Sequence, residues 1–279
     1  MELEQYREVG NDLYHRLHLP TYPVAVKFIQ SEDEIPPEAI RPSAGGQKWA
    51  LCQAFTYARR HGMHSAMTDK DNFCVPSSVS MGWVEVPMKE LFESQIRQGW
   101  HKDRAAEKRK FDFIANTLYG GPEGQERLHK MSQYMGFICS PLNTTIVIPD
   151  SVLIYGDNGH ISHLIQALVY DYTEPVTSSF EGFGESCMKG ALLPFITGKP
   201  QVVTPGMGDM AFSGTTVNEL AVGIPGPAVG QVNEYLFKTG GRQNMGFPLK
   251  SMLAMGVTES ITPGFKYLRE IVEKQQDKS

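Results

Sequence analysis

The sequence lacks several short motifs that identify common enzyme classes. It has no Walker lysine motif, no serine-nucleophile elbow and no paired histidines of the metalloprotease type. The segment 205–209, Pro-Gly-Met-Gly-Asp, follows an expected strand but has neither the third glycine nor the following helix of a dinucleotide-binding fingerprint. We therefore predict a tight turn at this segment, and hydrolysis and nucleotide binding have little support.

Long apolar runs and an excess of basic residues are also missing. The longest apolar runs are far shorter than the roughly 20 residues that cross a bilayer, and the first seven residues are polar and unlike a signal peptide. The net charge of −5 argues against nucleic acid as the main partner. A hydrophobic fraction of 41% and a charged fraction of 20% are typical of a globular protein. We expect a cytoplasmic protein without a membrane or nucleic-acid partner.

Cysteine is scarce, with four residues in 279, and no two of them are two residues apart. Such wide spacing in a large chain does not indicate a secreted disulfide framework, so in a reducing compartment these residues are thiols or metal ligands. Any cysteine site must be assembled from distant segments. The four are Cys52, Cys74, Cys139 and Cys187.

Hydrophobic periodicity predicts strands alternating with helices, which favours an α/β or mixed α+β fold. Predicted helices cover 2–18, 48–60, 88–99, 103–118, 158–168, 185–196, 228–238 and 263–275. Predicted strands cover 23–29, 64–67, 84–87, 137–139, 145–148, 152–155, 201–204 and 220–224.

An internal similarity predicts two related halves. Residues 53–74 and 166–187 align without a gap and share five identities, the last of which pairs Cys74 with Cys187. A cluster of Gly and Pro at 120–124 is the best boundary, dividing the chain into 1–120 and 121–279. We predict two pseudo-symmetric, intimately packed halves, each with a small sheet and packed helices.

Three cysteines are candidate ligands. Cys52 begins a predicted helix, where backbone amides and the helix dipole would stabilise a thiolate. Cys187 lies near another helix start, and Cys74 lies in a polar loop that needs an anchor. The alternative is that the cysteines are small buried hydrophobes, which we favour for Cys139 in its apolar strand.

Other polar residues are candidates for substrate binding and proton transfer. Arg59 lies one to two turns from Cys52 on an adjacent helical face and would orient an anionic group. Four residues could supply proton transfer. They are Lys27, Tyr57, Tyr170 and Asp209.

An ordered set of motifs resembles the ArCR family, a bacterial and archaeal family of unknown function that is frequent in anaerobes. The set comprises Cys52-Gln53, Ala58-Arg59, Gly62, Cys74, Pro141-Leu142, Pro149-Asp150, 153–156, 164–168, Cys187, Pro205-Gly206, Gly208-Asp209, Glu219-Leu220 and Ile224-Pro225. The resemblance implies that Cys52, Cys74 and Cys187 are family features, whereas Cys139 is particular to this chain. Related sequences tend to have Gly-Asp-Arg where this chain has Gly208-Asp209-Met210, which implies an altered substrate site if that arginine binds an anion.

The leading hypothesis from the sequence is a cysteine-ligated metal centre between the two halves. We expect an iron–sulfur cluster, of the 4Fe-4S type, bound by Cys52, Cys74 and Cys187, with one iron open for redox or lyase chemistry on a small, anionic metabolite. An electron-transfer partner and a homo-oligomer fit this hypothesis. One alternative is a non-catalytic cofactor- or metabolite-binding protein with zinc or structural cysteines. Another is an enzyme with a cysteine nucleophile.

Overall fold

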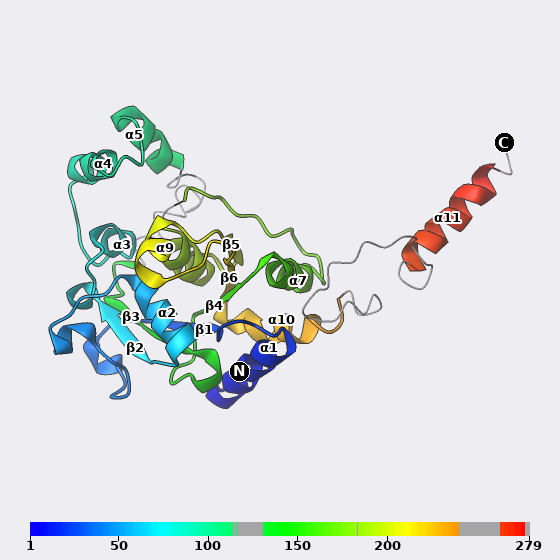
Figure 1. The fold of residues 1–279 in the computed structure, drawn as a ribbon, viewed down its shortest axis with the longest axis horizontal. Helices are drawn as coiled ribbons and strands as arrows, with labels where there is room; N and C mark the ends of the chain where they lie inside the picture. The colour runs from blue at the N-terminus through cyan, green and yellow to red at the C-terminus, as the bar shows by residue number, and fades with distance from the viewer. Residues whose placement is uncertain (114–115, 117–130, 183, 240–262, 277–279) are drawn as a thin grey trace.

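The computed structural model describes residues 1–113, 116, 131–182, 184–239 and 263–276. Its strands are β1 (Val24–Ile29), β2 (Ser65–Thr68), β3 (Gly136–Pro141), β4 (Ser151–Gly156), β5 (Gln201–Val203) and β6 (Leu220–Pro225). Its α-helices are α1 (Leu3–Arg16), α2 (Leu51–His61), α3 (Val75–Ser80), α4 (Met88–Arg97), α5 (Arg104–Phe113), α7 (Asn158–Leu168), α8 (Leu193–Thr197), α9 (Met207–Ser213), α10 (Val229–Tyr235) and α11 (Pro263–Gln276). The mixed α+β class is confirmed (Figure 1).

The six strands form one sheet in the order β2-β3-β1-β4-β6-β5, and every neighbouring pair is antiparallel. At the centre, β1 pairs with β4, with Val24 opposite Leu153 and Val26 opposite Ser151. The strands of the two predicted halves are therefore joined in a continuous sheet, where we expected two small sheets. The predicted boundary at 120–124 lies outside the described residues.

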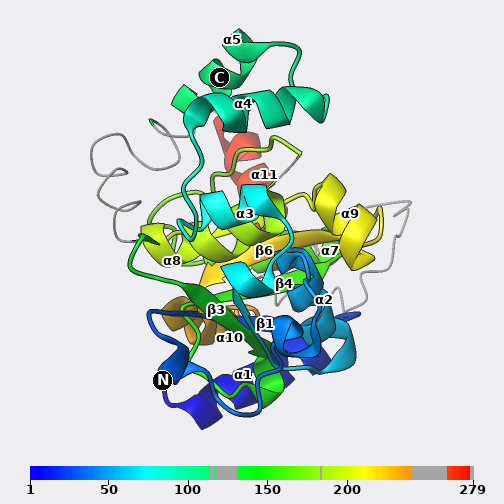
Figure 2. The same cartoon turned by 90° about the vertical axis from the view of Figure 1, so that its left-hand side faces the viewer.

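Helices cover both faces of the sheet because alternate strand residues point to opposite sides. On one face, α2 and the π-helical segment η6 (Glu185–Leu192) pack on the side chains of Val26, Phe28 and Phe137. On the other face, α1, α7 and α10 enclose a second core around Ala25, Val152 and Ile224. Figure 2 shows α3 and α9 above the sheet and α1 and α10 below it. The candidate site is built on the first of these faces.

Two predicted strands are absent from the structure. Residues 84–87 contain no strand and end at Pro87, which precedes α4. Residues 145–148 form a turn because the Thr145 hydroxyl makes two hydrogen bonds to Val147. It donates to the Val147 carbonyl and accepts from the Val147 backbone N–H. A side chain that satisfies the local backbone in this way competes with strand pairing.

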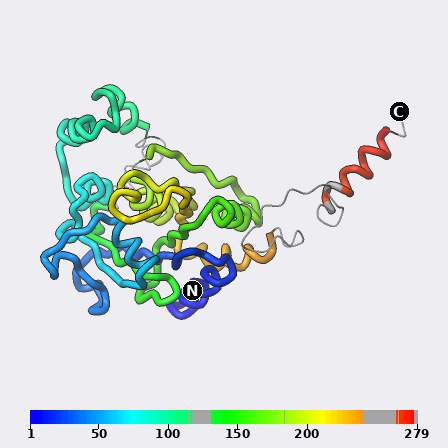
Figure 3. The backbone as a smooth tube through the Cα atoms, in the orientation of Figure 1, coloured from blue at the N-terminus to red at the C-terminus, as the bar shows by residue number. Residues whose placement is uncertain are grey.

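Two parts of the chain lie away from the sheet. Helices α4 and α5 pack on each other, with the rings of Phe92 and Phe111 5.8 Å apart, and they project together at one end of the molecule (Figures 1 and 2). Helix α11 stands apart from the sheet (Figure 3), so it does not close the fold as the sequence suggested. No helix in the described part of the chain is long and apolar enough to cross a membrane.

The similarity between 53–74 and 166–187 is not reflected in equivalent positions. Gln53 is the third residue of α2, whereas Gln166 lies near the end of α7 on the opposite face of the sheet. Cys74 precedes α3, whereas Cys187 lies inside η6. The pseudo-symmetry predicted from that alignment is therefore not confirmed.

Candidate functional site

The structure brings together Cys52, Cys74 and Cys187 from three separate elements. Helix α2 contacts both α9 and η6, and α3, which Cys74 directly precedes, contacts η6, so η6 is a neighbour of both other elements. The thiols are close enough that the charge of Cys74 would raise the pKa of both Cys52 and Cys187. Asp209, from α9, has the same effect on these two thiols.

Cys52 is held at the first turn of α2. The side chain of Gln53 accepts a hydrogen bond from the Ala50 backbone N–H at 2.7 Å and so caps the helix. The Cys52 Sγ donates to the carbonyl of Gly208 at 3.6 Å, which links α2 to the start of α9. Gly62 ends α2 in the left-handed conformation, with φ of 69°.

The Cys74 loop is ordered by its own polar side chains. The Cys74 N–H donates to Asn72 Oδ1 at 3.0 Å, and Asn72 Nδ2 donates to the Cys74 carbonyl at 2.9 Å. Buried Asp71 accepts hydrogen bonds from Arg41, at 2.8 Å, and from the Thr68 hydroxyl, at 2.7 Å. The prediction that this loop needs an external anchor is therefore wrong.

Cys187 lies in a π-helical segment that is fixed by a buried charge cluster. The Lys189 ammonium, almost fully buried, pairs with Glu181 and with Glu185, 3.3 Å away, and donates to the Ser179 carbonyl at 2.6 Å. Burial raises the pKa of Glu185. π-Helical turns are rare and occur frequently at functional sites. The sequence analysis missed this cluster, because a lysine four residues from a glutamate resembles an ordinary exposed helical pair.

Burial raises the pKa of the Cys52 and Cys187 thiols. It raises the pKa of Cys52 to about 12, with further increases from the charges of Asp209 and Cys74. Burial also raises the pKa of Cys187 well above its ordinary value. The prediction that the start of α2 would favour a Cys52 thiolate is therefore wrong, because desolvation outweighs the helix dipole.

Asp209 is buried at the N-terminus of α9. One carboxylate oxygen, Oδ2, accepts the Gly206 N–H at 2.9 Å, while Oδ1 has no hydrogen-bond partner of good geometry. Burial raises the pKa of Asp209, although nearby Ser186 and Arg59 act in the opposite direction. The segment 205–209, where we predicted a tight turn without a helix, instead enters α9 at Met207, and Asp209 caps this helix through its bond to the Gly206 N–H.

Arg59, near the end of α2, is held in a buried ion pair. Its Nη1 donates to Glu219 Oε1 at 2.6 Å, and its guanidinium lies 4.2 Å from the centre of the Tyr155 ring. Arg59 is 1% exposed, and Glu219 already compensates its charge. The structure thus gives Arg59 a bracing contact between α2 and the start of β6, and its role with a substrate anion stays a prediction.

The remaining proton-transfer candidates make their contacts elsewhere. Lys27 pairs with Asp150 at 2.9 Å, and it alternates along β1 with residues that face the cysteines, so it belongs to the opposite face. Tyr57 packs on Trp49, with ring centres 4.4 Å apart. The Tyr170 ring is 5.1 Å from Tyr235 of α10. Of these four predicted residues, the structure brings only Asp209 to the cysteines.

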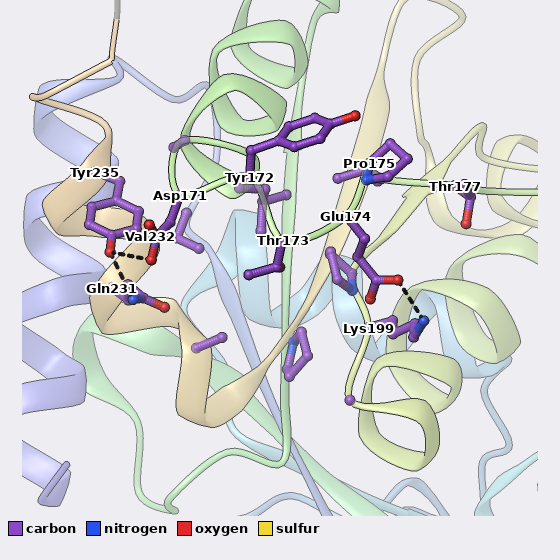
Figure 4. Close-up of a pocket in the computed structure, with 17 residues that line it drawn as sticks. Asp171, Tyr172, Thr173, Glu174, Pro175, Thr177, Lys199, Gln231, Val232 and Tyr235 are labelled. Carbon is purple, nitrogen blue, oxygen red and sulfur yellow. Dashed lines mark hydrogen bonds and ion pairs between the residues drawn. The ribbon is translucent and has the colours of Figure 1, made fainter.

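A separate hollow of about 220 Å³ lies between the end of α7, the segment after it and α10 (Figure 4). Its wall carries an ion pair between Lys199 and Glu174 at 2.9 Å, and the Tyr235 hydroxyl faces Asp171. No cysteine lines it. Within the described residues, no group of three or more His, Cys, Asp or Glu side chains is arranged to hold a metal ion.

The fold and the site define a mixed α+β protein with a cluster of three partly buried cysteines and one buried aspartate. The chain belongs to the uncharacterised ArCR family, whose model matches residues 12–235, so the expected family is confirmed. It is also similar to an uncharacterized protein of Methanocaldococcus jannaschii, with 23% identity over 227 residues, covering 81% of this chain and 91% of that relative. No solved structure matches the chain.

Proposed function

We propose that this protein binds a cysteine-ligated centre at Cys52, Cys74 and Cys187, with an iron–sulfur cluster as the first choice and zinc as the alternative. The observation that carries the proposal is that three partly buried thiols, from α2, from η6 and from the residue before α3, are close enough to affect one another's pKa, although they are not arranged to hold a single metal ion. Thiolates are the ligands that iron–sulfur clusters and zinc prefer. A metal would displace the thiol protons, so the raised pKa values make binding depend on pH.

The proposed activity is redox or lyase chemistry on a small anionic metabolite. Three protein ligands leave one position of a four-iron cluster for another group, and an open metal position acts as a Lewis acid on a bound substrate. The buried side chains of Arg59, Glu219 and Asp209 lie in the same neighbourhood and would exclude water.

The same neighbourhood weighs against an enzyme that uses Cys52 as its nucleophile. A thiol nucleophile needs a depressed pKa or an adjacent base. Burial raises the pKa of Cys52 and of Cys187, and the charge of Asp209 raises both further. A non-catalytic protein with zinc or structural cysteines remains the second candidate. The raised pKa values of Cys52 and Cys187 support it, as does the separate hollow near Tyr235.

The test is metal and sulfide analysis of protein purified without oxygen. We expect iron with matching acid-labile sulfide and a brown visible spectrum. We expect Cys52→Ser, Cys74→Ser and Cys187→Ser each to lose most of the iron. Cys139→Ser is the matched control, because Cys139 donates to the Ala54 carbonyl at 3.2 Å inside the core and takes no part in the cluster. Stoichiometric zinc in a colourless protein would favour the second candidate, and unchanged iron in all three variants would overturn the ligand assignment.

A further inference from the structure

The sheet has the same strand order when followed outward from its centre in either direction. On one side the order is β1, β3, β2, and on the other it is β4, β6, β5. Numbered in chain order, each side therefore has its first strand at the centre of the sheet, its third strand next to it and its second strand at the edge. The central pair, β1 and β4, is antiparallel, as a two-fold axis through the sheet would require.

The segments between these strands follow the same plan. Between the first and second strands of each side lies a helical segment on the same face of the sheet, α2 on one side and η6 on the other. The second side also has α7, which precedes η6 and packs on the opposite face. After the second strand comes a short helix, α3 or α9. The third strand ends at a proline, Pro141 or Pro225, and continues into a 3-10 turn.

Matching the two sides of the sheet element by element pairs the site residues differently from the sequence alignment of 53–74 with 166–187. Cys52, in α2, corresponds to Cys187, in η6, and 135 residues separate them. The same separation of 135 residues relates Cys74 to Asp209. Cys74 comes six residues after the end of β2, and Asp209 comes six residues after the end of β5. By its distance from the preceding strand, Asp209 thus corresponds to Cys74, although Cys74 directly precedes α3 whereas Asp209 is the third residue of α9.

The surroundings of Asp209 independently indicate an unfilled ligand role. The residue is 5% exposed, and its Oδ1 has no hydrogen-bond partner of good geometry, although Ser186 lies close enough to lower the pKa of the carboxyl group. A buried carboxylate oxygen without such a partner is unusual unless it meets an ion or a ligand. The titratable groups near it are the thiols of Cys52 and Cys187 and the guanidinium of Arg59.

We propose that Asp209 is the fourth ligand of the centre, completing a set of three cysteines and one aspartate contributed by four helical segments. This inference rests on the proposed function. On binding, each thiol and the carboxyl group, when protonated, releases its proton to solvent as the bond to the metal forms. A carboxylate is a harder ligand than a thiolate and would hold iron less firmly, so Asp209 would be the ligand that a substrate carboxylate replaces.

The experiment compares wild-type protein with Asp209→Ala and Asp209→Cys, all purified without oxygen and then exposed briefly to air. For the wild type we expect about four irons per chain. In Asp209→Ala we expect about three after exposure, with the electron paramagnetic resonance signal of a three-iron cluster. In Asp209→Cys, which copies the Cys74 position, we expect all the iron to remain and the reduction potential to shift, because a thiolate replaces the carboxylate.

Asp150→Asn is the matched control, since Asp150 pairs with Lys27 on the opposite face of the sheet. Its iron content and signal should equal those of the wild type. Asp209→Ala and Asp209→Cys that both keep the iron, signal and potential of the wild type would overturn the ligand role of Asp209 while leaving the three-cysteine site intact. Wild-type protein without iron and sulfide would instead overturn the cluster itself, so the two failures are distinguishable.

Discussion

At the scale of single residues, the site depends on a buried ion pair between α2 and the residue before β6. Arg59 and Glu219 form an ion pair in which the guanidinium side chain is fully buried and the carboxylate 8% exposed. Arg60 also reaches Glu219, at 3.0 Å, but from a side chain that is 33% exposed. The two arginines therefore provide a comparison between a buried and a partly exposed contact to the same carboxylate.

We expect Arg59→Met to destabilise the protein by about 3–5 kcal/mol, because it leaves Glu219 poorly compensated in a buried position. Arg60→Met is the control and should cost less than about 1 kcal/mol, since solvent screens the partly exposed pair. Urea unfolding followed by circular dichroism measures both. Equal losses in the two variants would contradict the bracing contact assigned to Arg59.

At the scale of elements, two glycines allow η6 to lie close to the sheet. A Cβ on Gly223 of β6 would lie 2.0 Å from the Gly190 carbonyl oxygen of η6, a contact that no side-chain movement relieves. Gly190 itself lies against Leu153. Because Cys187 is in η6, this close approach also sets the depth of Cys187 relative to the other cysteines.

We expect Gly223→Ala to cost toward the upper end of the roughly 1–3 kcal/mol of an overpacked core, and to reduce the iron bound per chain. Gly45→Ala is the control, since a Cβ there meets nothing within 4 Å and the change should stay within about ±0.5 kcal/mol. Thermal unfolding and iron analysis report the two effects. Full stability and iron content in Gly223→Ala would show that η6 does not depend on this contact.

At the scale of the whole molecule, buried carboxylates make stability depend on pH in opposite directions. For Glu219, burial works to raise the pKa, but the hydrogen bonds from Arg59 and Thr216 outweigh it and lower the pKa below its ordinary 4.5. Asp71 is lowered in the same way by Arg41 and Ser43. Their contributions are present above the unfolded pKa and are lost as the pH falls through the lower, folded pKa. Burial raises the pKa of Asp209, so its contribution to the stability of the folded protein has the opposite pH dependence and falls as the pH rises.

We therefore expect wild-type protein to be more stable than Glu219→Gln at neutral pH, and this difference to shrink as the pH falls below about 4.5. The reason is that a protonated Glu219 is nearly equivalent to glutamine. Urea unfolding at a series of pH values measures the difference. A difference that stays constant into the acid range would contradict the lowered pKa of Glu219.

Local patterns predicted much of the fold at the level of elements. The apolar spacing of 2–18 predicted α1, observed over Leu3–Arg16. Asp157 and Asn158 were both candidate caps for the helix that became α7, and the structure selects Asp157, which accepts the His160 N–H at 3.1 Å. The predicted strands 201–204 and 220–224 match β5 and β6 closely. These elements were predictable because helix caps and hydrophobic periods act over a few residues.

The sequence by itself determined the mixed α+β class, the family and the choice of Cys52, Cys74 and Cys187 as candidates. Only the tertiary structure decided that these thiols are neighbours, that Asp209 joins them, and that Lys27 lies on the other face of the sheet. It also decided the pKa of Cys52, which the helix start alone would lower and burial instead raises. The physical reason is that strand order and desolvation depend on contacts between residues far apart in the chain, which no local pattern records.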